Sequence, residues 1–338
     1  MGALRIATYN VEWFNALFDD KGRLLNDKGR SARHDVTRAD QITALGVVFR
    51  ALNADAVMVI EAPDQGSRRS AITALERFAK HFRLRTRRAI IGFISETEQE
   101  IAFLYDPDRL TVRHDPQEDV KAPAFNSLFR FDIDVDADPE PIRFSKPPLE
   151  LVMTLDGRDI RLIGVHAKSK APHGARTDAE RIRISIDNRR KQLAECVWLR
   201  RRVAGHLAAG ESLVVMGDFN DGPGLDEYEK LFGQSGVEIV LGLDAAPALQ
   251  MTDPHARMVL AQKVGVAPSS ARFYLVAQER YFEALLDFIM VSPDIAASAP
   301  HWRIWHPLND PVCWKTPTLR EALLVASDHF PVTLDLML

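Results

Sequence analysis

Cysteine and long apolar runs are both scarce in this chain. Its 338 residues include two cysteines, Cys196 and Cys313, which are too few for a disulfide framework or a cysteine-rich zinc site. No run of about 18 apolar residues occurs, so we predict no membrane-spanning helix. The first residues lead into a predicted strand without an apolar signal region, and we therefore expect a cytoplasmic protein.

Several common enzyme motifs are also missing. The sequence contains no GxxxxGKS/T loop, no GxGxxG after a strand, no GxSxG and no HExxH. Nucleotide-loop, serine-hydrolase and zincin functions therefore have no support. The composition, 46% hydrophobic and 27% charged, excludes disordered, collagen-like and coiled-coil classes. With no internal repeat and no Gly/Ser linker, we expect a single domain over residues 1–338, with an insertion at about 242–285.

Strand-like runs alternate with a few helical patterns. The turn Asp156–Gly157 joins two strand-like runs into a predicted hairpin, which excludes an all-parallel sheet. Two packed sheets with helices outside fit this order best, which gives an α/β fold class. We predict strands at 4–11, 54–60, 101–105, 149–155, 160–165, 213–216, 288–291 and 332–336. We predict helices at 37–52, 70–82 and 178–208, and loops with an edge hairpin at 114–148.

Acids, amides and histidines recur at the ends of the predicted strands. Any one of them could be a turn former, a helix cap or a structural histidine. Together they could line one sheet edge, where carboxylate and amide oxygens would suit Mg²⁺ or Mn²⁺ rather than zinc. Such a site is typical of phosphate chemistry. The residues are Asn10, Glu12, Glu61, His166, Asp218, Asn220, Asp287, Asp328 and His329.

Six motifs carry a resemblance to a known family. In chain order they are TYNVEW, VIEAPD, VHAKSK, GDFND, LLDFIMV and SDHFPV. This order and spacing resemble the endonuclease/exonuclease/phosphatase superfamily, in particular its deoxyribonuclease I-like branch. The resemblance implies a four-layer α/β/β/α sandwich of two packed mixed β-sheets. It also implies metal-dependent hydrolysis of phosphoesters.

The resemblance further implies roles for individual residues. Metal ligands would be Asn10, Glu61 and Asp328. Catalytic residues would be His166, Asp218, Asn220, Asp287 and His329, with Asp287 and His329 as a dyad. The sequence departs from the family at Ile60, where a glutamine is usual, and at Glu12, where abasic endonucleases have aspartate. Lys146 is the nearest candidate for a phosphate-contacting arginine. Whether Asp218 or His329 takes the proton, and whether one metal or two bind, stays open.

Charge distribution guides the choice of substrate. The net charge is -4, yet residues 161–202 contain twelve Lys/Arg and four acids, and residues 68–88 contain eight and one. A nuclease needs such a surface, because phosphate contacts dominate nucleic-acid affinity. We expect Glu12, Lys146, Lys168, Lys170 and Arg176 to bind substrate. We expect nucleic acid as that substrate and no obligate protein partner.

Other interpretations remain open from the sequence alone. The basic segments could be solvated helix faces. The enzyme could instead be a phosphomonoesterase or a phospholipid or sphingolipid phosphodiesterase of the same fold. A lipid enzyme should expose an apolar or aromatic hairpin, for which the region around Trp302, Trp305 and Trp314 is the only candidate. A non-enzymatic binder is disfavoured because every motif side chain is present.

Overall fold

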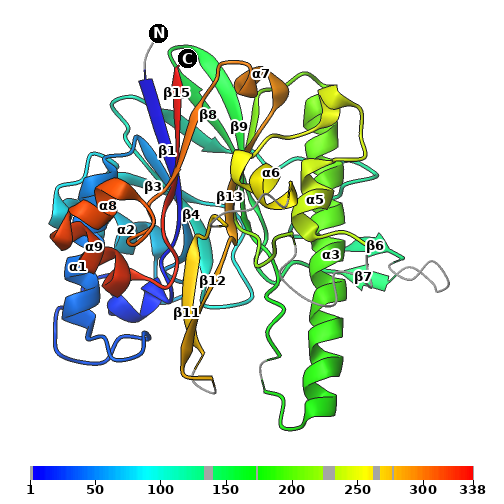
Figure 1. The fold of residues 1–338 in the computed structure, drawn as a ribbon. Coiled ribbons are helices and arrows are strands. Elements are labelled where there is room, and N and C mark those ends of the chain that lie inside the picture. Colours follow the sequence, from blue (N-terminus) through cyan, green and yellow to red (C-terminus); the bar gives the residue numbers. More distant parts are fainter. Residues whose placement is uncertain are drawn as a thin grey trace.

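Two large mixed sheets pack face to face between helical layers (Figure 1). This computed structural model describes residues 3–132, 140–172, 174–223, 233–261, 267–275 and 278–337. In spatial order, the six-stranded sheet contains β14 (His301–Ile304), β15 (Val332–Met337), β1 (Ala3–Asn10), β2 (Ala56–Ala62), β4 (Glu100–Tyr105) and β3 (Arg88–Ile91). The five-stranded sheet contains β13 (Asp287–Val291), β10 (Leu213–Asp218), β9 (Arg158–His166), β8 (Leu149–Leu155) and β5 (Thr111–His114).

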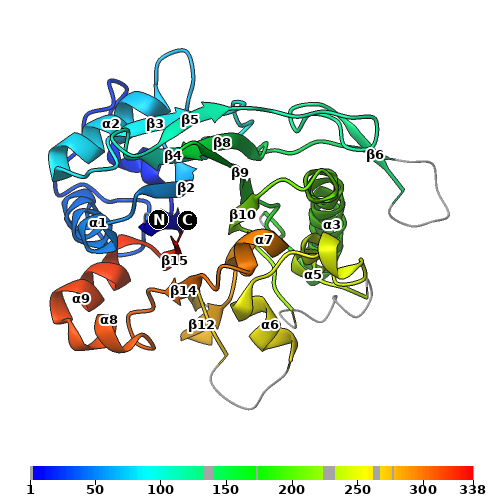
Figure 2. The same cartoon turned by 90° about the horizontal axis from the view of Figure 1, so that it is seen from above.

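Helices cover the outer face of each sheet, as the view from above shows (Figure 2). The six-stranded sheet packs against α1 (Arg38–Leu52), α2 (Ala71–Phe82) and α9 (Pro317–Ala326), with α8 (Pro311–Lys315) beside α9. The five-stranded sheet packs against α3 (Asp178–Ala208), α5 (Gly236–Leu241) and α6 (Pro254–Leu260). The predicted four-layer sandwich is therefore confirmed. None of the helices in the described part of the chain is long and apolar enough to cross a membrane.

Successive residues along a strand face opposite sides of its sheet, so the apolar side chains divide into three main hydrophobic clusters: one between the sheets and one beneath the helices on either side. On β1, Ile6 faces the other sheet, while Ala7 and Tyr9 face the helices. Met58 on β2 and Met216 on β10 meet in the layer between the sheets. A strand that is covered on both faces buries every residue, so the sequences of the central strands are continuous apolar runs.

Local signals explain why several elements begin and end where they do. Thr37 caps α1 by accepting a hydrogen bond from the Asp40 backbone N–H. Thr177 and Glu180 form a capping box at the start of α3. Asp156 and Gly157 both have positive φ, 50° and 80°, which is the conformation of a two-residue hairpin turn between β8 and β9.

The buried face of α3 is not the one that the spacing of its apolar residues predicts. Apolar periodicity from residue 182 onward predicts a continuous buried stripe, yet Ile182 is 51% exposed and Ile186 and Val197 are only half-buried. The reason is visible in Figure 1, where the N-terminal part of α3 extends beyond the end of the sheet that it covers. Beside the sheet, the buried face of the helix instead includes polar side chains, among them Arg189, Gln192 and Glu195.

Residues 242–285 lack clear periodicity in the sequence but contain regular elements. They include η2 (Pro247–Leu249), α6 and a hairpin of β11 (Ala271–Leu275) and β12 (Arg280–Ala284). Residues 262–266 and 276–277 of this range lie outside the described part. Earlier in the chain, where an edge hairpin was predicted within 114–148, β6 (Phe129–Phe131) and β7 (Glu140–Ile142) pair antiparallel as a separate two-stranded sheet.

Strand direction gathers the predicted polar strand ends at one edge of the molecule. The pairs β1–β2 and β9–β10 are parallel, so the carboxyl ends of each pair lie together. β13 runs antiparallel to β10, and its first residue, Asp287, lies opposite Asp218. On the other side of β10, His166 lies opposite Asp218. The backbone of β11 is bridged to the residues just before β15, through Ala271 and His329.

Candidate active site

A cleft of about 590 Å³ opens at this edge, between the ends of the two sheets. Apolar side chains in its wall come from Trp13, Phe273 and Leu286. Ten of the thirteen site residues predicted from the sequence line it: Asn10, Glu12, Glu61, Lys146, His166, Lys168, Asp218, Asn220, Asp328 and His329. The topology thus brings together side chains that are more than 300 residues apart in the chain.

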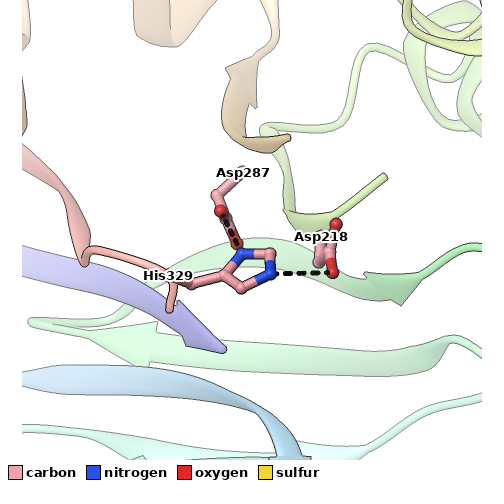
Figure 3. Close-up of side chains that lie close together, drawn as sticks. All are labelled: Asp218, Asp287 and His329. Atoms are coloured by element: carbon pink, nitrogen blue, oxygen red, sulfur yellow. Dashed lines mark hydrogen bonds and ion pairs between the residues drawn. The ribbon is translucent and has the colours of Figure 1, made fainter. Parts of the chain in front are cut away.

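Asp287 and His329 form a buried dyad (Figure 3). Nδ1 of His329 lies 2.7 Å from Oδ2 of Asp287, which leaves Nε2 directed toward Asp218 at 3.9 Å. Burial opposes the charged form of His329, but the carboxylates of Asp287 and Asp218 outweigh it and hold the pKa of the imidazole well above its usual value. The dyad therefore fixes both the orientation and the protonation of the ring.

Two buried serines hold the dyad, and neither was predicted from the sequence. Ser270 Oγ donates to the same Asp287 oxygen that contacts His329, at 2.8 Å, and accepts the backbone N–H groups of Leu286 and Asp287. Ser327 Oγ accepts the backbone N–H of His329 and donates to the carbonyl of Asn10. Ser327 is the first residue of the SDHFPV motif and could have been found, whereas Ser270 lies in a segment without a pattern.

Asp218 occupies the centre of the cleft and is almost fully buried. Its Oδ2 accepts a hydrogen bond from Asn10 Nδ2 at 3.0 Å, and its Oδ1 accepts the Asn220 backbone N–H at 2.7 Å. The same Oδ2 lies 3.8 Å from Nε2 of His166. Burial raises the pKa of Asp218 to about 6, although the charge of His329 opposes the shift. The carboxylate thus lies between two imidazoles, within reach of both.

His166 and Lys146 form the opposite wall. Nζ of Lys146 lies 3.2 Å from Nε2 of His166, and within the described residues Nδ1 of His166 has no hydrogen-bond partner. Burial and the Lys146 cation together hold the pKa of His166 well below its usual value. Burial also lowers the pKa of Lys146, against the attraction of Glu61 and Asp218. The wall offers one cation and one imidazole to an anionic ligand.

Left-handed backbone recurs around this cleft. Positive φ angles occur at Glu12 (31°), Trp13 (55°), Glu61 (58°) and Asn220 (49°), none of which is glycine. At Glu61 the pairing of β2 with β4 shifts by one residue, which is the signature of a β-bulge. The bulge turns the carboxylate into the cleft, where Oε2 accepts the Trp13 backbone N–H at 2.8 Å. Backbone strain of this kind concentrates at functional sites.

Oxygen donors for a metal ion collect in one corner of the cleft. Burial, followed by the charge of Asp328, raises the pKa of Glu12 to about 7, against the opposing charge of Arg33. Burial likewise raises the pKa of Asp328, and the nearby carboxylate of Glu61 adds to this shift. These carboxylates, together with the amide of Asn10, match the hard oxygen ligands of Mg²⁺ or Mn²⁺. The residues present therefore fit a divalent metal ion.

Among the acids and histidines of the described residues, one group of three already has its ligand atoms close enough together to bind a metal. Single ligand atoms of Asp218, Asp287 and His329 lie within 4.8 Å of one another. Nδ1 of His329 and Oδ2 of Asp287 already contact each other, however, and Ser270 donates to that same oxygen. This arrangement suits proton handling better than metal coordination.

The three predicted basic residues beyond His166 lie in different surroundings. Lys168 lines the cleft, and its backbone N–H donates to the buried carboxylate of Glu195. Lys170 instead forms an ion pair with buried Asp221, with Nζ 2.8 Å from Oδ1. Arg176 is exposed and does not line the cleft. Only Lys168 is therefore placed beside the dyad and its neighbours.

Gln192 on α3 joins the loops that carry these residues, and no sequence motif marks it. Its side-chain nitrogen donates to the carbonyls of Lys168, Phe219 and Asn220. One fully buried amide therefore links the loop after His166 to the loop after Asp218. A lone glutamine within a helix carries no motif, and its role depends on the tertiary contact.

Two packed mixed sheets with an Asp–His dyad, a second histidine and clustered carboxylates at one edge define the deoxyribonuclease I-like class of phosphoester hydrolases. The sequence model of the Endonuclease/Exonuclease/phosphatase family matches residues 7–329, and the chain belongs to this family. Enzymes of this family are generally dependent on a divalent metal ion. No curated protein matches the sequence.

Solved structures share the fold at low sequence identity. TDP2 from Caenorhabditis elegans is 12% identical with a TM-score of 0.52, over 100% of this chain and 75% of that chain. A family protein from Bacteroides thetaiotaomicron is 14% identical with a TM-score of 0.51, over 100% and 99%. D. rerio TDP2 complexed with single strand DNA product is 10% identical with a TM-score of 0.50, over 100% of both chains.

Proposed function

We propose that this hydrolase cleaves phosphodiester bonds of DNA or RNA by in-line attack of water. The position of Asp218 carries the proposal, because its buried Oδ2 lies 3.8 Å from Nε2 of His166 and 3.9 Å from Nε2 of His329. Hydrolysis needs a group that accepts the proton of water and donors for the phosphoryl oxygens. A carboxylate between two imidazoles can supply both from one face of the cleft.

In the proposed reaction, Asp218 orients the attacking water. A bond forms between the water oxygen and phosphorus, and the bond from phosphorus to the leaving oxygen on the opposite side breaks. The proton of the water passes into the Asp218–His329 pair, in which Asp287 fixes the ring orientation. Lys146 supplies positive charge beside the phosphoryl group, and His166 and Asn220 supply hydrogen bonds to its oxygens.

Asn10, Glu61 and Asp328 would hold Mg²⁺ or Mn²⁺. When bound, such an ion would neutralise negative charge on the phosphoryl and leaving oxygens. Glu12 would hold Asp328 in position, because its Oε2 accepts the backbone N–H of Asp328 and also pairs with Arg33. The Trp13 backbone N–H fixes one oxygen of Glu61 and leaves the other directed at the cleft.

A nucleic acid is the substrate that the charge distribution supports best. Lys146 and Lys168 line the cleft, and Arg176 lies exposed on the loop that follows, where it could contact the next stretch of backbone. Lys170 would instead stabilise that loop through Asp221. The similar fold of D. rerio TDP2 was solved with a single strand DNA product, which agrees with this choice.

A matched pair of histidines tests the proposal. His329 and His206 are both buried and both contact a carboxylate through Nδ1, but His206 lies on α3 away from the cleft. With Mg²⁺ or Mn²⁺, the wild type should cleave plasmid, linear duplex or single-stranded DNA or RNA, and EDTA should stop it. His329→Asn should lower kcat by roughly 10²–10⁴-fold, and His206→Asn should not. Equal activity of the two variants, or full activity in EDTA, would contradict the proposal.

A further inference from the structure

Aromatic side chains on the β11–β12 hairpin extend the wall of the cleft. Phe273 on β11 lines the cleft, and its ring centroid lies 5.5 Å from that of His329. Phe282 on β12 is the cross-strand partner of Phe273. Because directly paired residues project from the same face, Phe282 continues the aromatic surface outward from the dyad. Phe282 is 39% exposed, so part of its ring is open to a ligand.

The opposite face of the hairpin carries two exposed tyrosines, which contact each other and a neighbouring arginine. Tyr274 pairs with Tyr281 at a centroid distance of 5.1 Å, and the Arg272 guanidinium lies 3.3 Å from the centre of the Tyr281 ring. Glu283, on the same face, contacts both Arg272 and His306. The Phe273–Phe282 face differs from it in carrying the hairpin residue that lines the cleft, Phe273, whereas neither tyrosine lines the cleft.

The hairpin is fixed to the catalytic loop through its backbone. The Arg272 N–H donates to the carbonyl of Asp328 at 2.7 Å, and the Phe330 N–H donates to the carbonyl of Ser270 at 2.6 Å. Figure 1 shows β11 and β12 extending beyond the ends of the sheets at the edge where the cleft opens. A ligand lying on the Phe273–Phe282 face would thus enter the cleft next to His329.

A third aromatic side chain lies elsewhere in the lining of the same cleft. Trp13 follows β1, lines the cleft and is 44% exposed. Its backbone N–H holds Glu61, so its position is tied to the proposed metal corner. Exposed aromatic rings beside a phosphodiester site are suited to stacking with bases, and stacking tolerates any base sequence.

We propose that the Phe273–Phe282 face, together with Trp13, stacks the unpaired bases of single-stranded nucleic acid next to the scissile phosphate. This inference rests on the proposed nuclease function and narrows its substrate. Bases within a duplex are stacked on one another and cannot reach these rings, whereas the bases of a single strand can turn toward them. The enzyme should therefore bind single strands through both phosphates and bases.

The test compares two exposed aromatics on opposite faces of one hairpin, Phe282→Ala and Tyr274→Ala. Both variants also carry His329→Asn, so that the strand stays intact with Mg²⁺ present. Fluorescence anisotropy measures Kd for a twelve-residue oligothymidylate and for an abasic strand of equal length and charge. With the Phe282 side chain present, oligothymidylate should bind at least about five-fold more tightly than the abasic strand. Phe282→Ala should remove most of this preference, and Tyr274→Ala should keep it.

The outcomes separate the inference from the function on which it rests. If the wild type cleaves single-stranded nucleic acid but Phe282→Ala retains the full base preference, the stacking inference alone is overturned. If the wild type hydrolyses bis-p-nitrophenyl phosphate but no nucleic acid, the proposed function fails. Vesicles of phosphatidylcholine and sphingomyelin form a third arm. Vesicle binding that depends on Phe282, without a base preference, would overturn the inference and identify the hairpin as a lipid contact.

Discussion

Ser270→Ala tests whether the hairpin positions the catalytic dyad. The hydroxyl donates to Asp287 at 2.8 Å and accepts two backbone N–H groups at 3.0 and 2.9 Å, in a fully buried position. A hydrogen bond to a charged group is worth about 1.5–3 kcal/mol. If the Asp287 carboxylate is held in place mainly by this bond, its loss should lower kcat by roughly 10- to 100-fold. KM should change little, because Ser270 does not reach the substrate.

Ser292, directly after β13, offers a matched control at the opposite end of that strand from Asp287. It is equally buried, and its hydroxyl likewise donates to an aspartate, Asp294, and accepts a backbone N–H, that of Leu213. Both Ser270→Ala and Ser292→Ala should reduce the free energy of unfolding, by about 1–3 kcal/mol, since each leaves buried polar groups unpaired. Only Ser270→Ala should reduce kcat, and Ser270→Thr should restore part of it. Equal kcat values for the two alanine variants would refute the positioning role.

Three further predictions concern metal, charge and pH. Glu61→Gln should raise the Mg²⁺ concentration for half-maximal activity by at least about ten-fold, and an unchanged titration would remove Glu61 from the metal site. Lys168→Ala should reduce the log–log salt slope of single-strand binding by about 0.7, whereas Lys315→Ala on α8, outside the cleft, should not, and equal slopes would mean that Lys168 touches no phosphate. Asp253 is fully buried, and burial raises its pKa to about 6 from 3.8, so its contribution to stability is present below pH 4 and is lost as the pH rises through 6. Urea unfolding should show that Asp253→Asn weakens this fall in stability by roughly 3 kcal/mol between pH 4 and 7, and a fall identical to that of the wild type would contradict the shift.

Sequence motifs predicted most of the candidate site because strand order fixes where strand ends meet. Asn10, Glu61, His166 and Asp218 each lie at the carboxyl end of a strand in a parallel pair, so their convergence follows from the fold. The left-handed bulge at Glu61 could not be predicted, because glutamate has no special preference for that conformation.

The features that sequence reasoning missed depend on tertiary contacts. Lys170 ends the VHAKSK motif and carries the expected charge, yet it pairs with Asp221, 51 positions later. The aromatic hairpin was also missed, since Trp302, Trp305 and Trp314 are the more conspicuous cluster. In the structure Trp305 is buried and Trp302 donates to the carbonyl of Ile289, so these two anchor the fold. Phe273 and Phe282 become a surface only once their cross-strand register is known.

The left-handed residues around the cleft set a limit on how far this protein can be made heat-resistant without losing activity. A non-glycine residue in that conformation costs roughly 1–2 kcal/mol, while glycine at the same place loses about 0.5–1 kcal/mol through its greater freedom when unfolded. A screen for thermostability should therefore accept glycine at Glu12, Trp13, Glu61 or Asn220. Each such gain would remove a carboxylate, an indole or an amide from the cleft, so survivors of heat selection would accumulate as stable, poorly active proteins.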